Sequence, residues 1–360
     1  MQLIISIDKP KKIILIIFFE LNMKFFFAIF LLFLISNHSL CNEVNIFTSR
    51  HYQSDKTLYK IFTQRTGINV NIISGKSKAI EKRIEEEGKD CKGDLFIAAD
   101  AGRLHSMEKK GLLQKINSRV LETKIPSNLR TPFWFGITKR ARVFFYDPAS
   151  ISSEKIKNLR YEDLSNPEWE GELLIRSSSN IYNQSLVASL IENNGIEKTK
   201  KWAKGVVKNM ARMPQGNDRA QILGIVAGEG KIAVANTYYY ALMMSGQKGE
   251  EQKKAAQKLK PFFPNQNDRG THINISGAGI LKYSKNKQNT IKLLEFLLSE
   301  KAQEHMVNNT FEYPIIEGVK THKLVTNMGL DFKKDTATNV YSYGKWQAAA
   351  LKLMIEVGWK

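Results

Sequence analysis

Hydrophobic periodicity divides the first part of the chain into strands that alternate with helices. Segments 44–50, 68–75 and 94–100 carry alternating or continuous apolar residues, which is typical of strands. A helical pattern follows each strand: one is capped by Ser54 and Asp55 and ends at Gly67, one runs from Ser77 to Gly88, and one covers 101–111. The third strand is apolar throughout, like a central parallel strand. This alternation predicts a doubly wound α/β sheet.

The same alternation returns in the second half of the chain. A strand and loop are expected over 171–179, a helix over 183–195, a strand over 231–237 and a helix from Tyr240. Two long strand-like segments, 134–147 and 272–283, cross between the halves, and the chain from Asn286 onward is expected to be helical. The pattern predicts two α/β lobes joined by two hinge strands. The expected N-lobe is 42–138 plus 276–310, and the expected C-lobe is 139–275 plus 311–360 with the C-terminal helices.

The N-terminal region resembles an export signal. Met23 and Lys24 precede the apolar run FFFAIFLLFLIS, which is the length of a signal-peptide core and too short to span a bilayer comfortably. Residues 1–41 are therefore expected to be a signal peptide, cleaved after Cys41, with 1–22 as either an upstream extension or an elongated n-region. The alternative is one membrane anchor over 13–36, which would bury Glu20 and Lys24. The exported chain would keep a single cysteine, Cys91, and no intramolecular disulfide.

The charge balance is strongly basic, with 54 Lys and Arg against 35 Asp and Glu and a net charge of +19. Such a balance suits nucleic acid, an anionic membrane or an acidic partner. The basic residues are scattered, however, without an arginine-rich run, zinc spacing or an aromatic-basic RNA signature, so we expect a solvated surface and no nucleic-acid partner. Nucleophile-elbow, HExxH and dinucleotide-loop motifs are also missing from the sequence, which argues against an enzyme.

Tyrosines follow the predicted strands at the end where α/β sheets bind ligands. Tyr52 follows the first strand, Tyr182 the strand over 171–179, and Tyr238 and Tyr239 the strand over 231–237. A closing cleft could bring these phenols together. Phenolate is a hard anionic donor that suits Fe(III), although ionising one phenol at neutral pH costs roughly 4 kcal/mol. Binding should therefore release protons and weaken at low pH.

Two other ligands fit the same fold. Four tyrosines could surround an organic cation such as a polyamine. The loop SSSN over 177–180 lies at a predicted helix N-terminus and could hold an oxyanion.

The chain also resembles a known family, the periplasmic ferric-iron-binding proteins of ABC transporters, and in particular their tyrosine-rich, cyanobacterial-type subgroup. The segments that carry the resemblance are SRHYQSD (49–55), GDLFIAADAGRL (93–104), WFGITKRARV (134–143), SSSNIYNQS (177–185), GEGKIAVANTYYYA (228–241) and HINISGAGI (272–280). The resemblance spans essentially the whole exported chain. It implies a type II periplasmic binding-protein fold, a periplasmic location, a monomer, and an ABC permease of the inner membrane as the partner.

The resemblance also implies a set of site residues. Tyr52, Tyr182, Tyr238 and Tyr239 are the implied Fe(III) ligands, and Tyr240 is a packing residue. His51 matches a histidine that is a ligand in some relatives but not in the tyrosine-rich subgroup, which leaves ligation or a neighbouring hydrogen bond open. Arg142 matches a basic residue used beside the metal, and Asp100 is expected to support the site without binding the metal. Some relatives bind carbonate or another synergistic anion, and the sequence leaves this open.

Overall fold

The strands form one continuous sheet with the order β2-β1-β3-β8-β4-β6-β5, and β7 and β9 also pair with β4. The computed structural model describes residues 42–50 and 52–360, so the predicted signal peptide, its cleavage after Cys41 and the side chain of His51 lie outside the described residues. The strands are β1 (Glu43–Thr48), β2 (Asn69–Ser74), β3 (Leu95–Ala98), β4 (Trp134–Tyr146), β5 (Leu173–Leu174), β6 (Ile232–Asn236), β7 (Lys260–Phe262), β8 (Ile273–Ile280) and β9 (Tyr313–Pro314).

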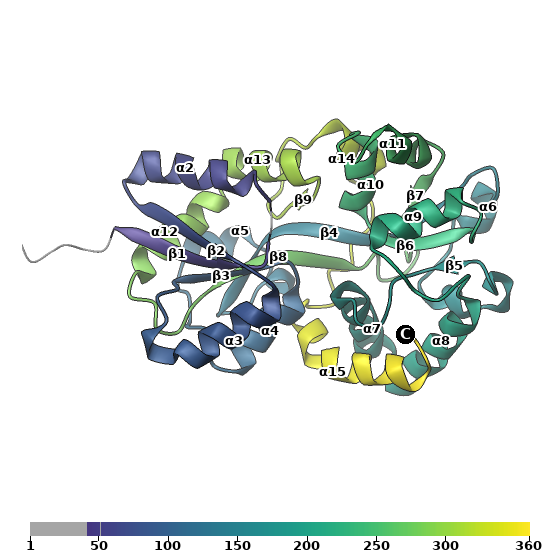
Figure 1. Cartoon of the computed structure of the whole chain (residues 1–360), viewed down its shortest axis with the longest axis horizontal. Coiled ribbons are helices and arrows are strands. Elements are labelled where there is room, and N and C mark those ends of the chain that lie inside the picture. Colours follow the sequence, from purple (N-terminus) through teal and green to yellow (C-terminus); the bar gives the residue numbers. More distant parts are fainter. Residues whose placement is uncertain (1–41, 51) are drawn as a thin grey trace, which may run out of the picture. The chain divides into compact units, whose positions relative to one another are not determined.

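Helices cover both halves of this sheet (Figure 1). Those of the first half are α2 (Asp55–Thr66), α3 (Ser77–Glu87), α4 (Ala101–Lys109), α5 (Arg119–Lys124), α12 (Lys287–Leu297) and α13 (Glu300–Thr310). Those of the second half are α6 (Ser153–Ile156), α7 (Ile181–Asn194), α8 (Ile196–Asn209), α9 (Asp218–Val226), α10 (Thr237–Met244), α11 (Glu250–Gln257), α14 (Lys323–Met328) and α15 (Tyr341–Glu356).

Most predicted strands and helices of the first half are confirmed. The β1 strand pairs in parallel with β2 and β3, and β3 is buried along its whole length, as its apolar composition predicted. Gly67 ends α2 in the left-handed conformation, at φ 69°, where glycine meets no steric penalty. Ser54 occupies the N-cap of α2 as expected but makes no side-chain capping bond, and the Asp55 carboxylate is instead bound by Arg50.

One expectation for the second half is confirmed and one is wrong. The expected strand and loop over 171–179 are present, with the strand β5 limited to two residues before the loop that leads to α7. The chain after Asn286 is not helical throughout. Phe311 adopts a left-handed conformation at the end of α13, and β9 and irregular segments separate that helix from α15.

The two long strands join the halves as the sequence predicted. Residues 134–141 of β4 pair antiparallel with β8, whereas residues 142–146 pair with β6. The register shifts between Gly136 and Thr138, which marks a bulge in β4. Every residue of β8 is buried, and so are those of β4 except Lys139. The lobe boundaries themselves stay a prediction.

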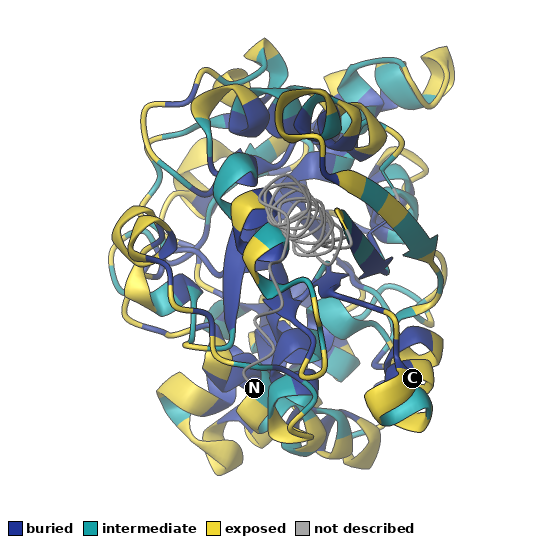
Figure 2. Ribbon diagram, turned by 90° about the vertical axis from the view of Figure 1, so that its left-hand side faces the viewer, coloured by how far each residue is buried: buried dark blue, intermediate teal, exposed yellow. Residues whose placement is uncertain are grey.

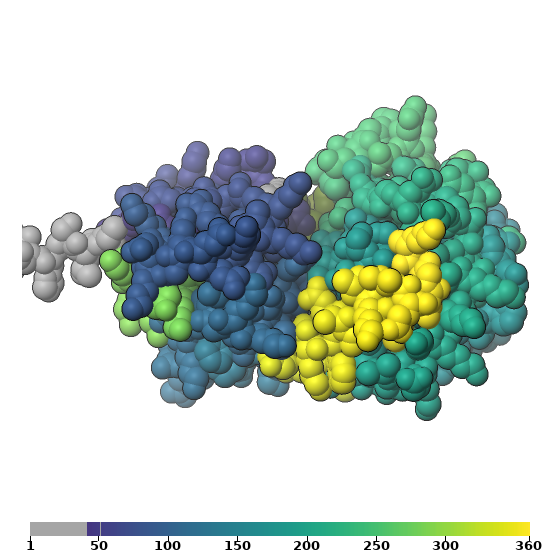
Figure 3. Space-filling model, turned by 60° about the horizontal axis from the view of Figure 1, so that its bottom comes forward, coloured from purple at the N-terminus to yellow at the C-terminus, as the bar shows by residue number. Residues whose placement is uncertain are grey.

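The hydrophobic core lies along the sheet, and the C-terminal helix α15 packs against it. Buried residues concentrate along the strands and the inner faces of the helices (Figure 2). In Figure 3 the α15 segment, in yellow, begins where the first and second halves meet and extends over the second half. Its Tyr343 hydroxyl donates to the carbonyl of Ile273 at 3.0 Å, and its Gln347 amide donates to Gln184 at 2.9 Å. Within the part of the chain that the structure describes, no helix has the length and apolarity needed to cross a membrane.

Candidate functional site

Three of the four predicted tyrosines lie in the first turn of a helix, and the fourth, Tyr52, lies in the loop that leads to α2. Tyr52 lies between β1 and α2, and its carbonyl accepts a hydrogen bond from the Asp55 amide at 3.2 Å. Tyr182 is in the first turn of α7, and Tyr238 and Tyr239 are in the first turn of α10. The β6 strand ends at Asn236 and α10 begins at the next residue, so this pair projects from the carboxyl end of the sheet. Helix N-termini favour negative charge at these positions.

The structure brings these phenols together. The Tyr238 hydroxyl donates to the Tyr182 hydroxyl at 3.4 Å, and the Tyr238 and Tyr239 rings lie 4.2 Å apart between centroids. Besides burial, the Tyr182 phenol raises the pKa of Tyr52, and the Tyr52 phenol raises the pKa of Tyr238, so Tyr52 lies within electrostatic reach of both. Tyr238 is buried and the other three are half-buried. Residues separated by more than 180 positions in the sequence therefore form one cluster, as the pattern of strands predicted.

Burial keeps three of these phenols, those of Tyr52, Tyr238 and Tyr239, protonated. It raises the pKa of Tyr52 and of Tyr238 well above the ordinary value, and the neighbouring phenols raise the Tyr238 pKa further. Burial and the coupling to Tyr182 raise the pKa of Tyr239 to about 12. A ligand that binds the phenolate form must therefore displace these protons.

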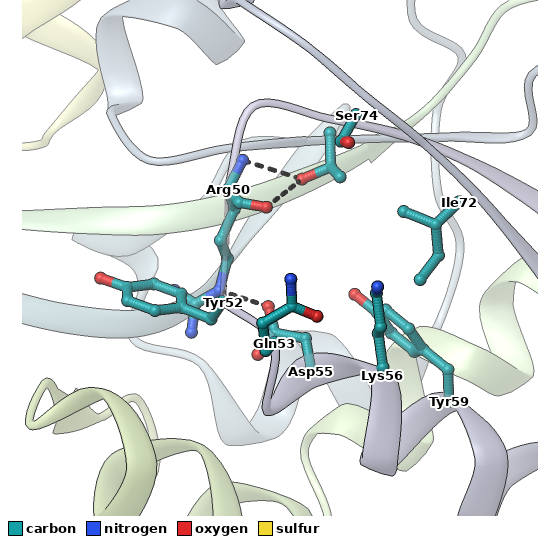
Figure 4. Close-up of a pocket in the computed structure, with 9 residues that line it drawn as sticks. Arg50, Tyr52, Gln53, Asp55, Lys56, Tyr59, Ile72 and Ser74 are labelled. Carbon is teal, nitrogen blue, oxygen red and sulfur yellow. Dashed lines mark hydrogen bonds and ion pairs between the residues drawn. The ribbon is translucent and has the colours of Figure 1, made fainter.

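Two buried guanidinium groups lie against the cluster. The Arg50 Cζ atom is 4.4 Å from the centroid of the Tyr52 ring, and the Arg140 Cζ atom is 5.0 Å from that of Tyr182. Figure 4 shows the Arg50 side chain extending between Tyr52 and Asp55, at the edge of a pocket of about 110 Å³. The positive charge of Arg50 and of Arg140 opposes the rise in the Tyr52 pKa. Both arginines favour negative charge on the phenols.

The role beside the metal that the resemblance implies for Arg142 stays a prediction. The Arg142 guanidinium donates to Asn183 Oδ1 at 2.6 Å and pairs with Asp218 Oδ2 at 3.3 Å. Arg140 lies two residues earlier on the same face of β4, and it is this residue that reaches Tyr182. Arg142 instead supports the residue that follows Tyr182. The sequence signal was the KRAR segment, which places two arginines on one face of a buried strand.

Asp100 joins the two halves of the chain. It is 1% exposed, caps α4 by accepting from the Gly102 amide at 2.8 Å, and accepts from Ser185 Oγ at 3.0 Å and Asn274 Nδ2 at 2.9 Å. Burial raises its pKa. Its contacts are with the start of α4, with α7 and with β8, which is consistent with the supporting position expected for it.

The remaining predicted residues divide into packing and surface groups. The Tyr240 hydroxyl donates to the carbonyl of Leu259 at 2.9 Å and its ring stacks on Phe145, so it packs as the resemblance implied. In the SSSN loop, Ser177 and Ser179 bond to each other at 2.6 Å, and Asn180 caps α7. Within the described residues, no group of three His, Cys, Asp or Glu side chains is placed to hold a metal ion. The tyrosine cluster is the candidate site.

The fold and the site together define the class. The chain has two α/β halves that share two long strands. Its polar cluster lies at the carboxyl ends of strands, where α/β sheets bind ligands. This is the architecture of an extracellular solute-binding protein. The chain belongs to the bacterial extracellular solute-binding protein family, whose model matches residues 90–346.

Individual relatives cover nearly the whole described chain. It is 45% identical over 320 residues to iron uptake protein A1 of Synechocystis, a match that covers 88% of each chain. It is 47% identical to the Trichodesmium protein IdiA, or FutA, solved with iron and citrate, with a TM-score of 0.85 over 88% of this chain and 100% of the other. A Campylobacter jejuni ferric binding protein is 39% identical, with a TM-score of 0.81 over 88% and 100%. These structures confirm the predicted two-lobed binding-protein fold.

Proposed function

We propose that this chain is an extracytoplasmic binding protein that captures Fe(III) through tyrosinates in the cleft between its lobes and delivers it to an ABC permease for iron uptake. The observation that carries the proposal is the convergence of Tyr52, Tyr182, Tyr238 and Tyr239 on one cluster. Four phenol oxygens in one place have a narrow chemistry, because a hard trivalent cation is the partner that best repays their ionisation.

The surroundings of the cluster favour a metal complex over a neutral ligand. A trivalent ion bound by four phenolates is anionic as a whole. The two guanidinium groups and the helix N-termini around the cluster offset that negative charge. An organic cation is less well supported, because Arg50 and Arg140 already lie over the ring faces of Tyr52 and Tyr182 on which such a cation would stack. The oxyanion alternative is also less well supported, because the hydroxyls of Ser177 and Ser179 bond to each other.

The relatives support the same cargo. The Synechocystis relative is an iron uptake protein, and the Trichodesmium structure holds iron and citrate. The relatives include a Serratia marcescens Fe(3+)-binding periplasmic protein. A periplasmic location, reached through the signal peptide, and an inner-membrane permease as partner are parts of this proposal. The family consists of solute-binding proteins, and we propose no enzymatic activity for the chain.

A visible spectrum tests the proposal. The protein beginning at residue 42 would be titrated with ferric citrate at neutral pH. A Tyr238→Phe, Tyr239→Phe double variant would be titrated in the same way. A broad phenolate-to-iron band that saturates at one iron per chain and collapses in the variant is the expected result. A colourless protein at every iron concentration would reject iron binding by these tyrosines and favour an anion or organic cation, whose complexes do not absorb visible light.

A further inference from the structure

One buried carboxylate, that of Glu312, connects the two arginines of the tyrosine cluster. Its Oε2 atom accepts from Arg50 Nη1 at 2.6 Å, and its Oε1 atom lies 3.3 Å from Arg140 Nη1. All three side chains are 1% exposed. Arg50 lies against Tyr52 and Arg140 against Tyr182, so a single carboxylate is two contacts away from phenols of both halves of the chain.

The same carboxylate is anchored to both long strands. Thr138 of β4 donates from Oγ1 to Glu312 Oε2 at 2.7 Å, and Ser276 of β8 donates from Oγ to Oε1 at 3.3 Å. Thr138 and Ser276 are opposite each other in the antiparallel pairing. The bulge in β4 falls immediately before Thr138, at the position where a bulge can redirect a side chain. Glu312 and the two arginines that it binds are thus fixed to the strands that connect the lobes.

The backbone is strained where it presents Glu312. Phe311 has φ 58°, in the left-handed region that bulky residues rarely adopt. Such strain tends to persist at functional positions. A buried ion cluster is also a poor means of stabilising a hinge, because desolvation cancels much of the attraction between the charges. Stability alone therefore does not explain the buried ion cluster.

Both guanidinium groups keep donor capacity. Among the described residues, Arg50 Nη2 and Arg140 Nε are buried without a hydrogen-bond partner. The Glu312 carboxylate sets the positions of the two guanidinium groups. It thereby determines where their unused N–H donors and their positive charge point. We infer that Glu312 is a positioning residue for iron binding, which holds Arg50 against Tyr52 and Arg140 against Tyr182 and so fixes these two phenols relative to each other across the lobes.

This inference rests on the proposed function, and the experiment separates the two. Thr138→Val removes the hydrogen bond that Thr138 donates to the carboxylate and the one that it accepts from Arg50 Nη1 at 3.2 Å, and it leaves every charge in place at nearly constant volume. Glu312→Gln keeps the size and removes the charge. Thr290→Val is the matched control, because Thr290 is also fully buried and its hydroxyl donates to the carbonyl of Asn286, the N-cap of α12. Iron-free protein would be unfolded thermally to compare the loss of stability.

The readouts are the wavelength of the ferric band and the rate of iron transfer to excess EDTA at constant pH. Thr138→Val and Glu312→Gln are expected to shift the band and to release iron about tenfold faster, the effect of losing one charged hydrogen bond. Thr290→Val is expected to lower the Tm without changing either readout. A structural role alone would lower the Tm of all three variants and move neither readout.

A double variant locates the effect. Thr138→Val should accelerate iron release less in a Tyr52→Phe background than in the wild type, because Glu312 and Arg50 act through the Tyr52 phenol. The inference is overturned if Thr138→Val and Glu312→Gln both keep the wild-type band and release rate. It is also overturned if Glu312→Gln slows release while Thr138→Val matches the wild type, because the carboxylate would then act through its charge and not through position. If Glu312→Gln does not fold, Thr138→Val decides alone. A colourless wild-type protein would instead reject the proposed function.

Discussion

Tyr239 and Tyr240 are adjacent in the sequence but have opposite surroundings, which makes them a matched pair for testing the role of proton release. Tyr239 lies against Tyr238 in the cluster, whereas the Tyr240 hydroxyl bonds to the carbonyl of Leu259. The pKa of Tyr239 is raised to about 12. Its ionisation at pH 7 therefore costs about 7 kcal/mol, which the bond to iron must exceed.

The sign of the pH dependence follows from this pKa. At pH 6 to 8 the phenol is protonated in the free protein, so it must lose a proton when iron binds, and a lower pH opposes binding. Wild-type protein would release one more proton per iron than Tyr239→Phe. The ratio of their apparent affinities should fall about tenfold for each pH unit of acidification, or about 100-fold between pH 8 and pH 6.

Competition with citrate at several pH values measures this ratio. The protonation of citrate and the hydrolysis of iron affect both proteins equally and cancel. Tyr240→Phe should show wild-type affinity at every pH, which controls for a general effect of removing a hydroxyl from α10. A ratio for Tyr239→Phe that stays constant across this range would refute the reasoning, because Tyr239 would then not be ionised in the complex.

Three further predictions concern the lobes, the hinge and the bound state. Asp100→Asn weakens the contact with Ser185 that joins the halves, so iron transfer to EDTA should be several-fold faster; an unchanged rate would contradict this. Gly277→Ala places a Cβ atom 2.9 Å from the carbonyl of Phe135 and should cost about 1–3 kcal/mol in urea unfolding, and a wild-type midpoint would show that the hinge can relax. Free iron at about 100 times its Kd should stabilise the protein by about 2.7 kcal/mol, seen as a higher Tm, and no rise would argue against binding to the folded state.

Much of the fold could be predicted from local patterns. The strands and helices of the first half have strong periodicity and clear ends, such as Gly67 and Gly88, and these elements were found where expected. The short length of β5 and the course of the chain between α13 and α15 could not be predicted in the same way. They depend on pairing with distant strands and on the left-handed Phe311, which no local pattern indicates.

Site residues could be predicted only where both the residue type and its place after a strand point to ligand binding. Tyrosine immediately after a strand carries its own signal, and all four predicted phenols lie in one cluster. The choice between Arg140 and Arg142 could not be made from sequence, because both lie on one face of β4 and only tertiary packing distinguishes them. Glu312 gave no signal at all, since a single glutamate after a helix is usually exposed.

Diffraction at the iron absorption edge tests the central claim most directly. Crystals of iron-loaded protein would give an anomalous difference map that locates the metal independently of the refined coordinates. The account predicts one strong peak within bonding distance of the phenol oxygens of Tyr52, Tyr182, Tyr238 and Tyr239. A peak elsewhere on the chain, or one bound by carboxylates with these four phenols still protonated, would contradict it.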